Sequence, residues 1–317
     1  MAIKKTTSAT PYQNFTRDQW RARCGEWPMP LTEADLEALQ GQIETVSLEE
    51  IRDIYVPIAR LLHVYQATET ERAQTIQNFL GRAATKIPFM IGVSGSVAVG
   101  KSMTSRVLKA LLSQGPDNLN VVIIPTDGFL KSTAQLEKEN LMDRKGFPES
   151  YCVQDLLHFV QAIKSGDLSV KAPIYSHQTY DIEPNAFREV AGADVIILEG
   201  LNILQTGMPL SVKQPKCFVS DYLDFSIYVD ADMDHIQAWF LERFLAFRDN
   251  AKHKTDEFFY QFTNMMDEAA IYFANTVWRD INLANLEQNI LPFKYRADLI
   301  LHKGQDHQVD QVQLRNH

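Results

Sequence analysis

The chain has 317 residues, of which 45% are hydrophobic and 22% charged, values typical of a folded globular protein and not of a disordered or fibrous one. Its 40 acidic and 31 basic residues give a net charge of −9, which argues against a general binder of nucleic acid or of anionic membranes. Three cysteines without metal-ligand spacing favour a reduced, cytoplasmic protein, and the polar amino terminus and lack of a long apolar run predict neither a secretory signal nor a membrane span.

The first part of the chain, residues 1–87, is expected to form a helical segment packed on the remainder. Residues 1–30 are polar and proline-punctuated, which predicts irregular structure. From residue 47 to about 81, apolar residues recur at helical spacing, and Pro57 is expected to kink or break that helix. Two capping boxes are expected at helix starts, Thr32 with Asp35 and Ser47 with Glu50.

The second part, residues 88–317, alternates short apolar runs with helical patterns. Continuous apolar runs of this kind are typical of buried parallel strands, and five occur, at 88–96, 120–129, 194–202, 224–232 and 297–304. Helical patterns lie between most of them, at 102–114, 153–165, 232–249 and 256–279. Alternating strands and helices predict an α/β fold, a mostly parallel sheet flanked by helices, whose ligands bind at the carboxyl ends of the strands.

A phosphate-binding motif follows the first of these strands. Residues 95–102 fit the pattern G-x-x-x-x-G-K-[ST] of a P-loop and open a predicted helix. In such a loop the backbone N–H groups surround phosphates, Lys101 reaches the β- and γ-phosphates, and Ser102 ligates Mg²⁺. A glycine-rich turn without a ligand is the alternative, which the flanking strand and helix disfavour. The candidate ATP-binding residues are Gly95, Ser96, Val97, Ala98, Val99, Gly100, Lys101 and Ser102.

Carboxylates end three of the other predicted strands. Asp127 suits a general base for a substrate hydroxyl, with an aspartate that merely caps an Asp-Gly turn as the alternative. Glu199 occupies a Walker-B-like position and is a candidate Mg²⁺ ligand, directly or through water. Asp230 is expected to be structural. The chain lacks the [NT]-K-x-D pattern of guanine recognition, which favours ATP over GTP.

Several further segments carry a family resemblance. The chain resembles the bacterial type I pantothenate kinase family nearly end to end, in GVSGSVAVGKS, PTDGFL, KGFPESY, PIYSH, ILEGLN, SDYLDFSIYVDA and NLEQNILP. The resemblance implies a P-loop kinase-like fold and ATP-dependent phosphorylation of pantothenate to 4′-phosphopantothenate, the first committed step towards coenzyme A. It also implies a homodimer and feedback inhibition by coenzyme A or its thioesters.

Roles for individual residues follow from the same resemblance. It implies that Asp127 is the base, that Lys101 and Arg243 assist catalysis, and that Lys303 and His307 lie near the adenine. Spacing alone does not distinguish Arg243 from Arg248, since an aromatic stripe on a helix is usually core and helix arginines are usually solvated. The implied pantothenate-binding positions are Lys145, Tyr175, His177, Tyr180, Phe240, Arg243 and Asn282. The implied coenzyme A contacts are Arg106, His177 and Phe247.

Three residues depart from the family pattern. Phe240 stands in place of a tyrosine that hydrogen-bonds the substrate, Cys152 in place of an N-capping aspartate, and Ile43 in place of a polar residue near the adenine. They concern substrate affinity, helix stability and base contacts, and leave the phosphate chemistry intact. The alternative functions are another P-loop small-molecule kinase, related to uridine kinase or phosphoribulokinase, and a non-catalytic regulator that binds a nucleotide or coenzyme A.

Overall fold

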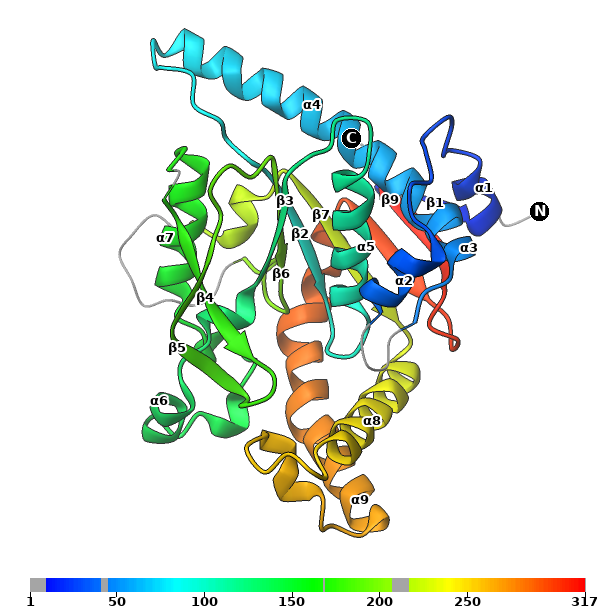
Figure 1. The fold of residues 1–317 in the computed structure, drawn as a ribbon, viewed down its shortest axis with the longest axis vertical. Helices are drawn as coiled ribbons and strands as arrows, with labels where there is room; N and C mark the ends of the chain where they lie inside the picture. The colour runs from blue at the N-terminus through cyan, green and yellow to red at the C-terminus, as the bar shows by residue number, and fades with distance from the viewer. Residues whose placement is uncertain (1–9, 41–44, 168, 207–216, 317) are drawn as a thin grey trace, which may run out of the picture.

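The computed structural model describes residues 10–40, 45–167, 169–206 and 217–316, and it confirms the α/β fold. A seven-stranded sheet has the order β1-β9-β8-β7-β2-β6-β3. The five strands from β8 to the edge strand β3 are parallel, and each lies within one predicted run, whereas β9 is antiparallel to β8 and β1 is antiparallel to β9 (Figure 1). The strands are β1 (Tyr12–Thr16), β2 (Phe89–Gly95), β3 (Val121–Pro125), β6 (Val195–Glu199), β7 (Phe225–Ala231), β8 (Leu299–Lys303) and β9 (Val309–Arg315).

The irregular structure expected for residues 1–30 is wrong for residues 12–21. Strand β1 pairs with β9, and helix α1 (Arg17–Arg21) follows it behind a capping box at Thr16. In β1 only Tyr12 and Phe15 are buried, so the strand lacks the apolar alternation that marks a strand in a sequence. Its pairing is supplied by the distant β9, which a local pattern does not reveal.

The long N-terminal helix is confirmed without a break at Pro57. It consists of α3 (Leu48–Glu50), a π-helical turn η1 (Ile51–Tyr55) and α4 (Val56–Phe79). Pro57 is the second residue of α4, and the helix continues from η1 into α4 through the bond from the Val56 N–H to the Ile51 carbonyl. What changes next to Pro57 is the helix type, from π to α, without a break in the helix.

One of the two predicted capping boxes forms completely. Thr32 and Asp35 bond reciprocally at the start of α2 (Glu33–Leu39). Ser47 accepts a bond from the Glu50 backbone, but the Glu50 carboxylate accepts from the N–H of Val309 in β9. The second box is therefore half-formed, because Glu50 is buried and supports the sheet edge.

The remaining helices flank the sheet or extend beyond it. Predicted helices correspond to α5 (Lys101–Ser113), α7 (Val153–Lys164) and α8 (Met233–Asn250). The single helix predicted over 256–279 is wrong: a 3₁₀ turn, η6 (Phe258–Phe262), precedes α9 (Asp267–Val277) and a π-helical η7 (Trp278–Leu283). Shorter elements are η2 (Thr126–Phe129), α6 (Thr133–Lys138), η3 (Met142–Arg144), η4 (Pro148–Ser150), η5 (Val219–Tyr222), η8 (Leu286–Ile290) and η9 (Leu291–Arg296).

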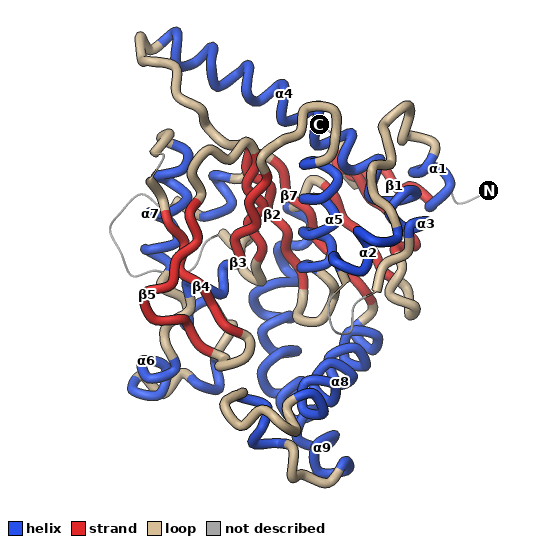
Figure 2. The backbone as a smooth tube through the Cα atoms, viewed as in Figure 1, coloured by secondary structure: helices blue, strands red, loops and turns tan. Residues whose placement is uncertain are grey.

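A two-stranded antiparallel hairpin stands apart from the main sheet. It consists of β4 (Lys171–Ser176) and β5 (Asp181–Glu189) and forms no ladder with the seven strands (Figure 2). In the same view α8 and α9 lie together at one end of the molecule, below the main sheet. The hairpin and these helices thus supply side chains that the parallel sheet itself does not carry.

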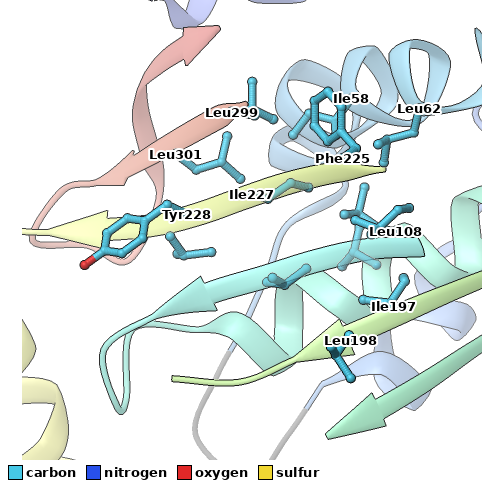
Figure 3. Close-up of a cluster of buried hydrophobic side chains, with 14 of the residues drawn as sticks. Ile58, Leu62, Leu108, Ile197, Leu198, Phe225, Ile227, Tyr228, Leu299 and Leu301 are labelled. Atoms are coloured by element: carbon cyan, nitrogen blue, oxygen red, sulfur yellow. The ribbon is translucent and has the colours of Figure 1, made fainter. Parts of the chain in front are cut away.

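One hydrophobic core joins the N-terminal helices to the sheet. Ile58 and Leu62 of α4 lie beside Phe225 of β7, and the ring of Tyr65 meets Phe225 edge-on at 5.0 Å (Figure 3). Strands β2 and β7 are buried along their whole length, as in a sheet covered on both faces. No helix in the described ranges has the length and hydropathy to span a membrane. The division into residues 1–87 and 88–317 stays a prediction.

Candidate active site

The P-loop has the local structure that its sequence predicts. It leaves the carboxyl end of β2, between β6 and β7, and enters α5 at Lys101. Gly100 has φ of +96°, and a Cβ there would lie 2.7 Å from the Nζ of Lys303 at the end of β8. Glycine is therefore needed at this position, and Lys303 is brought next to the loop although it is 203 positions away.

The polar groups of the loop and of the neighbouring strand β6 bond to one another. The Nζ of Lys101 donates to the Ser96 carbonyl at 2.7 Å, and the Ser102 hydroxyl is hydrogen-bonded to the Glu199 carboxylate. The Ser96 hydroxyl is buried without a hydrogen-bond partner in the described chain. A buried orphan donor at this place is costly unless an acceptor such as a phosphate oxygen satisfies it. The side chains of Val97, Ala98 and Val99 pack against or within the core, so these residues would contact a phosphate through their backbone.

The candidate base, Asp127, follows strand β3, which is separated from the P-loop strand β2 by β6. In the sheet register Glu199 of β6 is opposite both Val93 of β2 and Pro125 of β3, so it separates the P-loop from the end of β3. Asp127 follows two residues later, in η2. The hydroxyl of Tyr151 donates to its Oδ1 at 3.4 Å.

Aromatic and basic side chains gather on the other side of Asp127. The ring of Tyr175 meets those of His177 and Tyr180 edge-on, at centroid distances of 5.3 and 6.2 Å. The Nζ of Lys145 lies 4.1 Å from the ring centre of Tyr180 and donates to its carbonyl at 2.6 Å. Tyr180, at φ of +58°, also stacks on Phe258 at 4.4 Å. The hairpin turn and the segment around Lys145 therefore form one cluster.

Electrostatic effects within this cluster converge on Asp127. Burial lowers the pKa of Lys145 to about 8, against the raising effect of Asp181 and Asp127. The pKa of His177 is lowered by burial and by the positive charge of Arg243, and the negative charge of Asp127 only partly opposes this. Burial raises the pKa values of Tyr175 and Tyr180, and the Asp127 charge raises both further. Asp127 therefore lies close to four of the predicted substrate-binding groups.

Helix α8 closes the same region with its arginine and aromatic residues. The guanidinium of Arg243 lies 5.2 Å from the ring centre of Phe247, on the same helix one turn later. Phe247 packs against Phe259, and Phe240 packs against Trp278 at 5.8 Å. Asn282 lies half-buried in η7, the turn that Trp278 opens. Arg248, by contrast, pairs with Asp249 and Asp267, whereas the charge of Arg243 acts on His177 of the cluster.

The other predicted positions have partners outside the substrate cluster or lie outside the described chain. His307 stacks on Trp239 of α8 with centroids 4.0 Å apart. The Nε of Arg106 donates to the Leu39 carbonyl at 2.8 Å, which ties α5 to α2. Asp230 pairs with Lys294, in keeping with a structural role. Cys152 occupies the N-cap of α7 without a side-chain cap, as predicted, and Ile43 lies outside the described residues.

Comparisons with known proteins agree with this geometry. Residues 90–289 match the model of the phosphoribulokinase / uridine kinase family. A pantothenate kinase of Coxiella burnetii is 50% identical over 316 residues, which cover 99% of each chain. The chain belongs to the pantothenate kinase family. A pantothenate kinase of Shigella boydii is 47% identical over 315 residues, 99% of this chain and all of the relative.

The fold is also found in a distant kinase. D-glycerate 3-kinase from Cryptococcus neoformans has a TM-score of 0.53, with 16% identity over 80% of this chain and 98% of the other. At that identity the likeness concerns the fold alone. The family assignment therefore rests on the pantothenate kinases, which match the chain over nearly its full length.

Two residues at the site of this pantothenate kinase family member were not assigned roles from the sequence. Tyr151 ends the KGFPESY segment and bonds to Asp127. In the sequence, its place in that family motif was the only feature that could have indicated a role. Trp239 belongs to an aromatic stripe whose pattern predicts a core position. It is buried, and its ring also stacks on the His307 ring. Neither role has a local pattern, because each depends on a partner from another part of the chain.

Proposed function

We propose that the protein transfers the γ-phosphoryl group of ATP to the primary hydroxyl of pantothenate, giving 4′-phosphopantothenate. The observation that carries the proposal is the position of Asp127. It stands between a P-loop on one side and a cluster of basic and aromatic side chains on the other. A carboxylate between a phosphate site and an organic-anion site suits a base for phosphoryl transfer.

The phosphate end is supported by Lys101, Lys303 and the orphan hydroxyl of Ser96. Two lysines beside a loop of inward-turned N–H groups neutralise the charge that spreads over the phosphate oxygens during transfer. On binding, Lys101 would exchange its Ser96 carbonyl for phosphate oxygens. His307, stacked on Trp239, would offer a flat surface to the adenine, with Lys303 nearby.

The residues at this end also fit a magnesium ion. Ser102 and Glu199 are already hydrogen-bonded to each other, and they provide hard oxygen ligands. No group of three or more His, Cys, Asp or Glu side chains that could hold a metal occurs in the described ranges, so phosphate oxygens and water would complete the shell. When bound, Mg²⁺ would neutralise phosphate charge and orient the transferred group.

The substrate end is supported by the chemistry of pantothenate, which carries a carboxylate, amide and hydroxyl groups and an apolar body. Lys145 and Arg243 provide positive charge for the carboxylate, and His177 and Asn282 provide hydrogen bonds. Tyr175, Tyr180 and Phe240 provide apolar surface. Asp127 would accept the proton of the substrate hydroxyl as that oxygen attacks phosphorus.

We further propose that this reaction begins coenzyme A synthesis in the cytoplasm, in a homodimer inhibited by coenzyme A or its thioesters. Arg106, His177 and Phe247 are the proposed contacts of the inhibitor. His177 and Phe247 belong to the substrate cluster, and Arg106 projects from the helix that the P-loop opens. An inhibitor that spans both ends would compete with both substrates.

The test is ATP consumption with Mg²⁺, measured with and without pantothenate and repeated with coenzyme A. Pantothenate-dependent turnover that coenzyme A suppresses is the expected result. Turnover that ignores pantothenate but responds to uridine or ribulose 5-phosphate would place the chain with another small-molecule kinase. Slow hydrolysis unaffected by every acceptor would identify a nucleotide-binding regulator and overturn the proposal.

A further inference from the structure

We propose that Tyr151 is a positioning residue, which holds the Asp127 carboxylate in the orientation needed to receive the proton of the substrate hydroxyl. The inference rests on the proposed function, since it assigns Tyr151 a part in the same reaction. Tyr151 is 7% exposed, and its hydroxyl donates to Oδ1 of Asp127 at 3.4 Å.

The backbone around Tyr151 is fixed to the segment that carries the base. Tyr151 and Leu130 form an isolated antiparallel bridge. On either side of it, Lys131 N–H donates to the Ser150 carbonyl and Cys152 N–H donates to the Phe129 carbonyl, both at 2.8 Å. These bonds leave the tyrosine ring little freedom to move relative to η2, which contains Asp127.

The base is also held from the opposite side. A Cβ on Gly128 would lie 2.1 Å from the carbonyl oxygen of Pro173 in β4, so η2 packs directly against the hairpin. Backbone contacts thus fix the position of η2, but they leave the side-chain torsions of Asp127 free to rotate. The Tyr151 hydroxyl is a contact that selects among those torsions, which is the physical reason for the assignment.

The same tyrosine links the base to the substrate site. Lys145 and Tyr151 belong to one short segment, in which Gly146 N–H donates to the buried Ser150 hydroxyl at 3.0 Å. A substrate held by Lys145 would therefore contact the same short segment that carries Tyr151. Catalytic hydrogen bonds are often long in the free enzyme and tighten in the complex.

The Tyr151 hydroxyl keeps its proton and can therefore donate to the base. Burial and the Asp127 charge raise the pKa of Tyr151, so it remains a donor over the working pH range. The other groups that face Asp127 are Lys145 and, from the hairpin, Tyr175, His177 and Tyr180.

The test compares Tyr151→Phe with the wild type in steady-state turnover with pantothenate and ATP each varied. Phenylalanine keeps the ring, so packing is retained. We expect kcat to fall about tenfold with KM for both substrates unchanged, because the hydroxyl orients the base and contacts neither substrate. The matched control is Tyr12→Phe, which removes another buried hydroxyl, bonded to the Ala297 carbonyl at the far edge of the sheet.

Each outcome decides the proposal. A lower kcat with both KM values unchanged, absent in Tyr12→Phe, supports the positioning role. An unchanged kcat, a fall in kcat accompanied by a higher KM for either substrate, or an equal loss in Tyr12→Phe overturns it while leaving the proposed function intact. A wild-type protein whose ATP turnover ignores pantothenate overturns the proposed function first, and the role of Tyr151 fails with it.

Discussion

The two ends of the candidate site are built in different ways. The phosphate end consists of eight consecutive residues, 95–102, whose backbone is shaped by one strand, one helix and glycine at position 100. The pantothenate end is assembled from side chains of the Lys145 segment, the β4–β5 hairpin, α8 and η7, which are spread over more than 130 positions. A site of the first kind depends on local conformation, whereas a site of the second kind depends on the whole fold.

The two ends also bind by different forces. Backbone N–H groups, a helix N-terminus and lysines recognise phosphate by charge and direction, and they tolerate little change in spacing. Stacked rings and a half-buried lysine recognise an organic anion by shape and by a desolvated charge. Substitutions at the first end should therefore change kcat, and substitutions at the second should mainly change KM.

Asp127, which lies between the two ends, should show the largest effect. We expect Asp127→Ala to lower kcat by about a thousandfold with little change in either KM, because general base catalysis contributes factors of this size. Steady-state kinetics with both substrates varied, together with circular dichroism as a check of folding, measures it. Turnover close to wild type would show that Asp127 is a turn residue and not the base.

Lys101→Met tests the phosphate end alone. The methionine keeps the aliphatic stem but removes the charge that stabilises the transferring group, so kcat should fall about a hundredfold. The Nζ of Lys101 donates to the Ser96 carbonyl, and the thermal midpoint of the variant, measured beside kcat, checks that its fold is retained. A variant that loses pantothenate affinity but keeps kcat would contradict the division between the ends.

Lys145 tests the substrate end through its titration. Burial lowers its pKa to about 8 in the free protein, so above that pH it loses the charge that attracts the pantothenate carboxylate. KM for pantothenate should therefore rise above pH 8, by up to about tenfold per unit, while KM for ATP stays constant. Lys145→Arg, which remains charged, should flatten the profile, and a flat wild-type profile would remove Lys145 from carboxylate binding.

The difference between the ends explains what the sequence could predict. The five parallel strands and the P-loop were predictable, because apolar runs and motif spacing are local features. The half-formed cap at Glu50 and the edge strand β1 were not, since each depends on β9 more than 250 residues away. The substrate cluster was expected only through family resemblance, and the bond between Tyr151 and Asp127 depends on a bridge between segments about 20 residues apart.

Phe240→Tyr should lower the KM for pantothenate, with a smaller effect than the changes above. The Phe240 ring packs on Trp278 and is half-buried, so an added hydroxyl has a route towards the substrate cluster. If it bonds to pantothenate, KM should fall about threefold to tenfold, the effect of one net hydrogen bond of about 1 kcal/mol. The control is KM for ATP, which should not change. An unchanged KM for pantothenate would mean that other groups already satisfy the substrate at this place.

Cys152→Asp should have the smallest effect, on stability and not on catalysis. Cys152 is the N-cap of α7 and provides no side-chain bond, although its N–H is bonded to the Phe129 carbonyl beside the base. An aspartate there would accept from the first-turn N–H groups and raise the free energy of unfolding by about 1 kcal/mol, as measured by urea denaturation. Cys152→Ala, which adds no acceptor, should give no gain, and equal stability in both variants would exclude the cap. Because the segment from Lys145 to Cys152 links the substrate cluster to Asp127, an unchanged kcat in the aspartate variant would show that this segment is already rigid enough for the reaction.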